Sequence, residues 1–451
     1  MFLALLLAAA APAGPYLAEG SKAGEITDRS AVIWTRLSAR PRPNPGRYVA
    51  EPVQRGVAVL PPGKAAAELP GAVPGMAGRV RLRCDGRTTA WAEVTAATDF
   101  THQFNLDGLK PAQRYEYELE TSGGARHRGA FRTAPEPGAA AGVRFTVVTG
   151  LMYRHLDDPE GYRSFAAMRK NPPDFLVYTG DNVYYDNEPP RATTAEVARY
   201  HWQRMFSLPR LVELNAAIGT YWEKDDHDTL YNDVWPTLHP KAMLPFTFEE
   251  GQRIFLQQAP VGGNLSRTFR WGRHLQIWLP EGRDFRSPNN APDGPGKTIL
   301  GAEQKRWLKS SVEASDARYR IIVNQTPWVG PDRGNKGDNY ANKAFATEGA
   351  EMRAWAAGLK NIYVITGDRH WQYHSVDPKT GLHEFSCGPA SNEHAAGSPG
   401  EDKTYHRFHK VQGGYAWVEI GADGSAVFEL RDVEGRTAYS WKAPAAAAPN
   451  R

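Results

Sequence analysis

Apolar and polar residues follow two different patterns along the chain. Residues 18–135 form short, turn-separated segments rich in β-branched and aromatic residues, and these predict strands near residues 30–37, 78–84, 90–96, 102–109 and 114–121. This part of the chain therefore predicts a small β-sandwich. After a linker rich in Pro, Ala and Gly at residues 133–142, apolar strands alternate with helical segments, which predicts an α/β layered domain.

The α/β part has a regular alternation. Apolar runs predict strands at residues 143–150, 174–181, 217–226, 275–284, 319–327 and 361–370. Segments of helical period lie between them, at residues 160–171, 194–208, 301–314 and 348–359, and a β pair follows at residues 415–432. Within the second helix, Trp202 and Phe206 are expected in the core.

Length and charge narrow the class of protein. A chain of 451 residues exceeds what one hydrophobic core usually serves, which favours two domains or one domain with a sizeable satellite. The net charge of +4 comes without a dense Lys/Arg run, so a nucleic-acid partner is not expected, whereas a small anionic substrate is. Cys84 and Cys387 fall in different predicted domains, so the fold is not expected to depend on a disulfide, and a bridge between them is not predicted.

Residues 1–13 are apolar and end in Ala-Pro-Ala, the pattern of a secretory signal cleaved after Ala13. The stretch is too short to span a bilayer, so no membrane span is expected. It lacks a basic leading region and a twin-arginine pair, so the sequence does not indicate the export route. The expected location is periplasmic or extracellular.

Acids and histidines gather where predicted strands end. Such clusters occur at residues 180–184, 225–228, 281–284 and 367–370. Each one alone has a plain interpretation as a turn or a solvated loop. Because the carboxyl ends of strands in an open α/β sheet converge on one rim, these side chains are expected to meet, and a bound cation would relieve their repulsion. The conjunction favours a metal site that holds an attacking hydroxide and a phosphoryl oxygen.

The stretches GDNVYYD, DDHD, EGRDFRS, LGAEQKRWL and TGDRHW together resemble the alkaline phosphatase D family of metallophosphatases. The N-terminal part resembles a fibronectin type III module, with Leu109, Pro111 and Tyr115 at its turn and strand. The resemblance implies a fibronectin III-like domain at residues 14–135, a four-layer α/β/β/α metallophosphatase sandwich at residues 143–442 and a flexible tail at residues 443–451. It also implies hydrolysis of phosphomonoesters or phosphodiesters outside the cytoplasm through a metal-bridged hydroxide.

The resemblance also implies roles for individual residues. Five would bind metal: Asp181, Tyr184, Asp226, Asp368 and His370. His227 would hydrogen-bond the phosphoryl oxygen or protonate the leaving group, and Arg283 would grip phosphate through its planar fork. Asn182 is a further candidate substrate contact.

Two loops are candidate borders of the site. The polar, glycine-bearing loop at residues 324–345 is a hypothetical substrate mouth with Lys336, Asp338 and Asn339 as contacts, and an ordinary surface loop is an equal alternative. The segment that holds Glu393 and His394 is the second candidate.

The chain departs from the family pattern at Gly150 and Leu151, where the family commonly has a Cys-Gln pair whose thiolate binds iron. Without this thiolate, iron is doubtful, and calcium is the first expectation, with zinc or manganese as alternatives. Purple acid phosphatases share Gly-Asp-x-x-Tyr but end in Gly-His-x-His, whereas Asp368 follows Gly367 here. Two alternatives stay open: a family member that binds phosphate or polyanions without turnover, and an ester hydrolase for sulfated or phosphorylated glycans.

Overall fold

The computed structural model describes residues 14–50 and 56–444. The predicted signal segment at residues 1–13 and the tail from residue 445 lie outside these residues. No helix in the described ranges is both long enough and apolar enough to cross a membrane.

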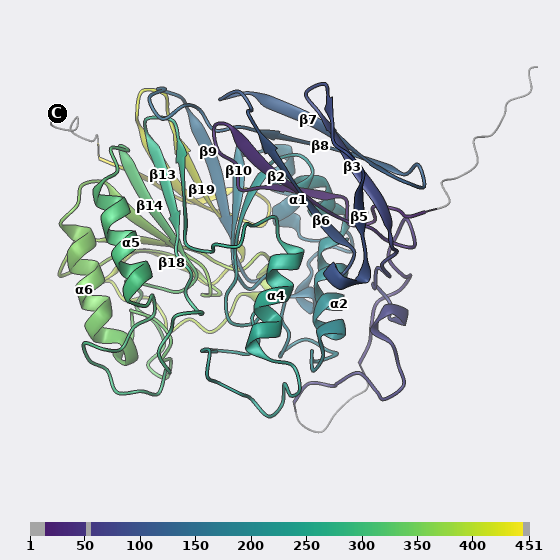
Figure 1. Cartoon of the computed structure of the whole chain (residues 1–451). Helices are drawn as coiled ribbons and strands as arrows, with labels where there is room; N and C mark the ends of the chain where they lie inside the picture. Colours follow the sequence, from purple (N-terminus) through teal and green to yellow (C-terminus); the bar gives the residue numbers. More distant parts are fainter. Residues whose placement is uncertain (1–13, 51–55, 445–451) are drawn as a thin grey trace, which may run out of the picture.

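Two large mixed sheets form the centre of the molecule (Figure 1). The nine-stranded sheet has the order β21 (Thr437–Lys442), β20 (Ala426–Asp432), β19 (Gly414–Ile420), β9 (Val143–Val148), β10 (Phe175–Thr179), β11 (Gly219–Glu223), β1 (Ser21–Gly24), β2 (Ser30–Arg36) and β6 (Thr101–Asp107). The seven-stranded sheet has the order β12 (Arg267–Trp271), β13 (Leu275–Leu279), β14 (Tyr319–Asn324), β15 (Ile362–Thr366), β17 (His383–Cys387), β16 (Gln372–Val376) and β18 (His406–Lys410).

Helices cover the outer faces of both sheets. They are α1 (Arg163–Lys170), α2 (Ala195–Phe206), α3 (Pro209–Asn215), α4 (Phe248–Gln258), α5 (Ala302–Glu313) and α6 (Ala346–Ala357). Val147 of β9 and Ile321 of β14 share one buried cluster, so the two sheets face each other. The first four helices pack against the other face of the nine-stranded sheet, and α5 and α6 lie along the other face of the seven-stranded sheet (Figure 1). The elements thus lie in four layers.

The N-terminal part joins the nine-stranded sheet. Strand β1 runs parallel to β11, with Ala23 opposite Gly219, and β2 and β6 continue the sheet outward. This pairing satisfies backbone groups that an edge strand would leave open. The sequence-based boundary at residue 135 therefore does not coincide with a boundary between sheets.

A third sheet packs beside these strands. It contains β4 (Arg87–Thr88), β3 (Gly78–Cys84), β7 (Arg114–Thr121) and β8 (Arg126–Arg132), and β5 (Ala92–Val94) pairs with β3. The strands expected in this part of the chain are present, and its likeness to fibronectin type III stays a prediction.

Local pattern located most elements of the α/β part. All six predicted strands are present as β9, β10, β11, β13, β14 and β15, and the four predicted helices as α1, α2, α5 and α6. The pattern did not predict β12, β16, β17, β18, α3 or α4. Trp202 and Phe206 are buried, as expected. Cys84 and Cys387 are both free and buried.

Candidate functional site

Two glycines allow the strand ends to meet at one rim. A Cβ at Gly180, after β10, would lie 2.4 Å from Cβ of Asp225, and a Cβ at Gly367, after β15, would lie 2.3 Å from Oγ1 of Thr179. Real side chains do not tolerate contacts this short, so larger residues would push the strand ends apart. The ends of β10 and β11 approach each other through Gly180, and the two sheets approach each other through Gly367.

Each of these glycines precedes an acid in a left-handed backbone conformation. Asp181 has a φ of 53° and Asp368 has a φ of 55°. Asp adopts this region more readily than most residues, and such conformations cluster at functional sites, where the surrounding structure holds them. The backbone thus places both acids at the junction of the two sheets.

The carboxylates that follow β10, β11 and β15 converge there. Two groups have ligand atoms within 4.8 Å of one another: Asp181 with Asp226 and His227, and Asp181 with Asp225 and Asp368. Oδ1 of Asp181 and Oδ2 of Asp225 are buried without a hydrogen-bond partner.

Burial, together with the acids around it, raises the pKa of Asp181 well above its ordinary value, although the nearby His227 opposes the shift. A cation in this cluster would supply a partner to the unpaired oxygens and favour the ionised carboxylates. The donor set therefore fits one or more metal ions.

Tyr184 and His370 extend the cluster. The Tyr184 hydroxyl donates to Oδ2 of Asp181 at 2.8 Å and lies 3.3 Å from Nε2 of His370, which in turn is 3.8 Å from Oδ2 of Asp181. A phenol, an imidazole and a carboxylate thus surround one point. The structure brings these three sequence-predicted ligands together.

His227 is oriented by a neighbouring acid. Its Nδ1 lies 2.6 Å from Oδ1 of Asp186, while Oδ2 of Asp186 accepts the backbone N–H of Asn232 at 3.0 Å. Burial alone would lower the pKa of His227, but the carboxylates of Asp186, Asp226 and Asp181 outweigh it and raise the pKa well above its ordinary value. With Nδ1 engaged, Nε2 is the ring nitrogen left for another group.

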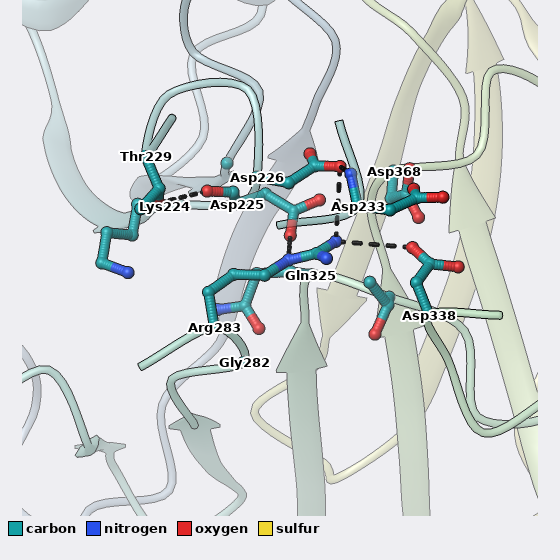
Figure 2. A network of polar contacts seen from close by, with 12 residues as sticks. Lys224, Asp225, Asp226, Thr229, Asp233, Gly282, Arg283, Gln325, Asp338 and Asp368 are labelled. Carbon is teal, nitrogen blue, oxygen red and sulfur yellow. Dashed lines mark hydrogen bonds and ion pairs between the residues drawn. The ribbon is translucent and has the colours of Figure 1, made fainter. Parts of the chain in front are cut away.

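Arg283 is enclosed by acids (Figure 2). Its Nε donates to Oδ1 of Asp225 at 2.6 Å, and Nη2 lies 3.8 Å from Asp226 and 3.5 Å from Asp338. The side chain is 0% exposed. The guanidinium faces carboxylates rather than an open cavity, so a direct grip on phosphate stays a prediction without support from its position.

The side chain of Lys224 forms ion pairs that link two strand ends next to Arg283. Its Nζ donates to Oε1 of Glu281 at 2.8 Å and to Oδ1 of Asp284 at 2.5 Å. The pairs connect the end of β11 to the end of β13, which carries Arg283. They therefore help to place Arg283 beside Asp225.

Two predicted substrate contacts are buried structural residues. The side-chain amide of Asn182 donates to the Glu223 carbonyl at 2.9 Å and to Oδ2 of Asp228 at 2.6 Å. Asn339 donates to Asp332 and Asp338, at 2.8 and 3.0 Å. Asn182 and Asn339 are both 0% exposed. Their amides hold loops that support the site, and their role as substrate contacts stays a prediction.

Lys336 lies beside the carboxylate cluster, and its role as a substrate contact stays a prediction. Its Nζ forms an ion pair with Asp233, whose backbone N–H donates to Oδ2 of Asp226 at 2.5 Å. The lysine side chain is 13% exposed. Lys336 is thus a partly accessible cation that is connected to the carboxylate cluster through Asp233.

Sequence reasoning left Asp225 and Asp186 out of its candidate site residues and named His394 only within a candidate border of the site. Asp225 joins the metal-type cluster, Asp186 orients His227, and the ring centroid of His394 lies 3.9 Å from that of His370. The acid-rich stretch DDHD carried a signal for Asp225, but local pattern does not tell which of two successive acids points inward. The contact between His394 and His370 depends on tertiary packing, which the local sequence pattern around His394 does not show.

Family models match both parts of the chain. One described as "PhoD-like phosphatase" matches residues 145–437, and one described as "PhoD-like phosphatase, N-terminal domain" matches residues 4–135. Among curated proteins, alkaline phosphatase D of Bacillus subtilis (strain 168) is 22% identical over 344 residues, which cover 66% of this chain and 58% of that protein. The chain thus spans less than two thirds of that relative's length.

Solved structures share the fold. A structure of PhoD matches with a TM-score of 0.74 and 17% identity, covering 96% of this chain and 90% of the other. A purple acid phosphatase from yellow lupin (Lupinus luteus) seeds matches with a TM-score of 0.63 and 10% identity, covering 94% and 73%. These likenesses show an α/β metallophosphatase-like fold. Because the matched family model covers residues 145–437, which are more than half of the chain and include every strand end of the acidic cluster, the chain belongs to the PhoD-like phosphatase family.

Proposed function

We propose that this protein is an exported, metal-dependent phosphoesterase that hydrolyses phosphomonoesters or phosphodiesters. The observation that carries the proposal is the group of buried acids at the junction of the two sheets. Some of their oxygens have no hydrogen-bond partner, and bound cations would supply one. Membership of the PhoD-like phosphatase family supports the same chemistry.

The metal ligands in this proposal are the residues that converge on Asp181. They are Asp181, Tyr184, Asp225, Asp226, Asp368 and His370. Bound divalent cations would lower the pKa of a water nucleophile and neutralise charge on the phosphoryl oxygens. The donors are oxygens and imidazole nitrogens, which suit calcium, zinc, manganese or iron.

The chain's own residues supply the rest of the chemistry. Asp186 holds His227 so that Nε2 can give a proton to the departing alcohol oxygen. Lys336, as the partly exposed cation, attracts the phosphoryl group to the rim. Arg283 offsets the charge of Asp225, Asp226 and Asp338 and lowers the pKa of each of these carboxyls, although burial leaves the pKa of Asp225 well above its ordinary value.

Hydrolysis assays test the proposal directly. The purified protein is expected to hydrolyse p-nitrophenyl phosphate, its bis-ester, or both, and to lose this activity when a chelator removes bound metal. Asp181→Ala and His370→Ala are expected to abolish turnover. Activity that survives in both variants and in chelator would reject the mechanism, and tight phosphate binding without turnover would favour a binding protein instead.

The metal itself can be identified by two measurements. A ferric ion bound to the Tyr184 phenolate should give a visible charge-transfer band that Tyr184→Phe removes. Colourless protein that contains calcium, zinc or manganese by elemental analysis would exclude iron.

Export is the remaining part of the proposal and rests on the apolar residues 1–13. N-terminal sequencing of the protein from the periplasm or medium of a bacterial host is expected to show cleavage after Ala13. An uncleaved protein retained in the cytoplasm would contradict export without affecting the phosphoesterase proposal.

A further inference from the structure

Gly150 and His394 meet beside the carboxylate cluster although they are far apart in sequence. Gly150 lies just after β9 and has a φ of 65°. Nδ1 of His394, which ends a short 3-10 turn (Asn392–His394), lies 3.1 Å from the carbonyl oxygen of Gly150. A Cβ built on Gly150 would lie 3.4 Å from that nitrogen and 3.1 Å from Cβ of Pro389. The imidazole therefore lies against a residue that has no side chain of its own.

The contact with Gly150 fixes which nitrogen of His394 carries the proton. A carbonyl oxygen only accepts hydrogen bonds, so Nδ1 is the donor. In a neutral imidazole Nε2 then keeps its lone pair, and no hydrogen bond engages Nε2 within the described part of the chain. A histidine that binds metal typically donates its other ring N–H to a backbone carbonyl or carboxylate in this way.

The surroundings of His394 place it next to the cluster. Its ring centroid lies 3.9 Å from that of His370 and 5.3 Å from that of Tyr184, and both of these residues contact Asp181. The residue is only 6% exposed. The ring of His394 therefore packs directly against two of the side chains that form the proposed ligand set around Asp181.

We infer that His394 is a further metal ligand, through Nε2, for the cation held by Asp181, Tyr184 and His370. The inference rests on the proposed metal site and specifies the chemistry of one position in it. Two imidazoles, a phenol and a carboxylate form a mixed nitrogen and oxygen set, whereas calcium takes six to eight oxygens. This position therefore selects a transition metal such as zinc or iron, and calcium is confined to the oxygen donors around Asp225 and Asp226.

Metal binding, measured apart from catalysis, tests the inference. Metal-free parent protein, His394→Ala and His394→Cys are titrated with Co²⁺ and Zn²⁺, and the visible spectrum of the cobalt forms is recorded. His409→Ala is the matched control, because His409 lies on β18 and its Nε2 bonds Oγ of Ser398 rather than a residue of the cluster. Asp181→Ala reports on the metal site as a whole, and the thermal unfolding of each metal-free variant checks its fold.

His394→Ala is expected to weaken Zn²⁺ and Co²⁺ binding by more than about 100-fold, beyond the 10–100-fold that loss of an outer-shell partner causes. Calcium binding and His409→Ala should stay at parent values. In His394→Cys a new thiolate-to-cobalt charge-transfer band, absent from the parent, is expected, and this readout does not depend on whether the alanine variant folds.

The outcomes distinguish a failure of the inference about His394 from a failure of the proposed metal site. If the parent binds metal, Asp181→Ala loses it, and both His394 variants keep the parent affinity and spectrum, the inference about His394 is overturned and the metal site stands. If the parent binds no metal, or Asp181→Ala binds as the parent does, the proposed metal site fails and the inference fails with it.

Discussion

The guanidinium of Arg283 donates from Nε to Oδ1 of Asp225 at 2.6 Å, and both side chains are 0% exposed. Removing one partner of a buried ion pair destabilises a protein far more than the intact pair stabilises it, because an unpaired buried charge is left behind. This pair lies between the ends of β11 and β13, so it couples the stability of the two sheets to the charge of the site.

Breaking the pair from one side should destabilise the metal-free protein. Arg283→Met is expected to lower the free energy of unfolding by about 3–5 kcal/mol, because Asp225, Asp226 and Asp338 lose their shared cation. Urea unfolding measures the loss. The double variant Asp225→Asn with Arg283→Met should lose less than the sum of the two single variants, and strict additivity would show that the two residues are not coupled.

Asp186 should matter for catalysis only through His227. Asp186→Asn is expected to reduce kcat about 10–100-fold, because the imidazole loses the carboxylate that orients it, with bound metal unchanged. Steady-state kinetics and elemental analysis measure both quantities. In a His227→Ala background the same substitution should have little further effect, so an equal loss in both backgrounds would contradict the assigned role.

Glu384 holds the loop that carries Lys336 and Asp338. Its carboxylate accepts the backbone N–H groups of Trp328, Val329 and Gly330, at 2.5, 3.0 and 2.9 Å, and the Tyr373 hydroxyl at 2.8 Å. Glu384→Gln is expected to cost about 3 kcal/mol, because the amide group turns a donor toward other donors.

Chemical denaturation and hydrogen exchange at residues 328–330 measure the effect of Glu384→Gln. Tyr373→Phe is the control, since it removes one hydrogen bond only and should cost about 1 kcal/mol. Unchanged exchange at these three amides in Glu384→Gln would show that the loop does not depend on the carboxylate.

Lys22 should make stability depend on alkaline pH. Its Nζ donates to the Gln258 carbonyl at 2.7 Å, and the residue is 1% exposed. Burial lowers the pKa of Lys22 from 10.5 to about 7, although the nearby Glu19 opposes this shift. Between these two pH values the unfolded chain binds a proton that the folded chain does not, so stability rises with pH in this window.

Comparison with Lys22→Met isolates this contribution. The free energy of unfolding of the parent, minus that of the variant, should increase by about 1.4 kcal/mol per pH unit between pH 7 and pH 10. Urea unfolding at several pH values measures it. A difference that stays constant over this range would mean that Lys22 remains protonated in the folded protein.

The sequence by itself determined most elements of the α/β part and the family of this protein. Apolar runs followed by Gly-Asp located the ends of β10 and β15, because strand pattern and turn chemistry are local properties of the chain. The spacing of Asp181 and Tyr184, and the stretch from Asp368 to His370, identified residues that do meet in space.

The tertiary structure alone decided which side chains face the site and which support it. Asn182 is a polar loop residue whose amide bonds the distant Asp228, and Arg283 is enclosed by two acids at the end of β11 and by Asp338 in a loop. The pairing of β1 with β11 and the contact of His394 with Gly150 join segments about 200 or more residues apart. Such contacts follow from the packing of the whole chain, which local periodicity does not contain.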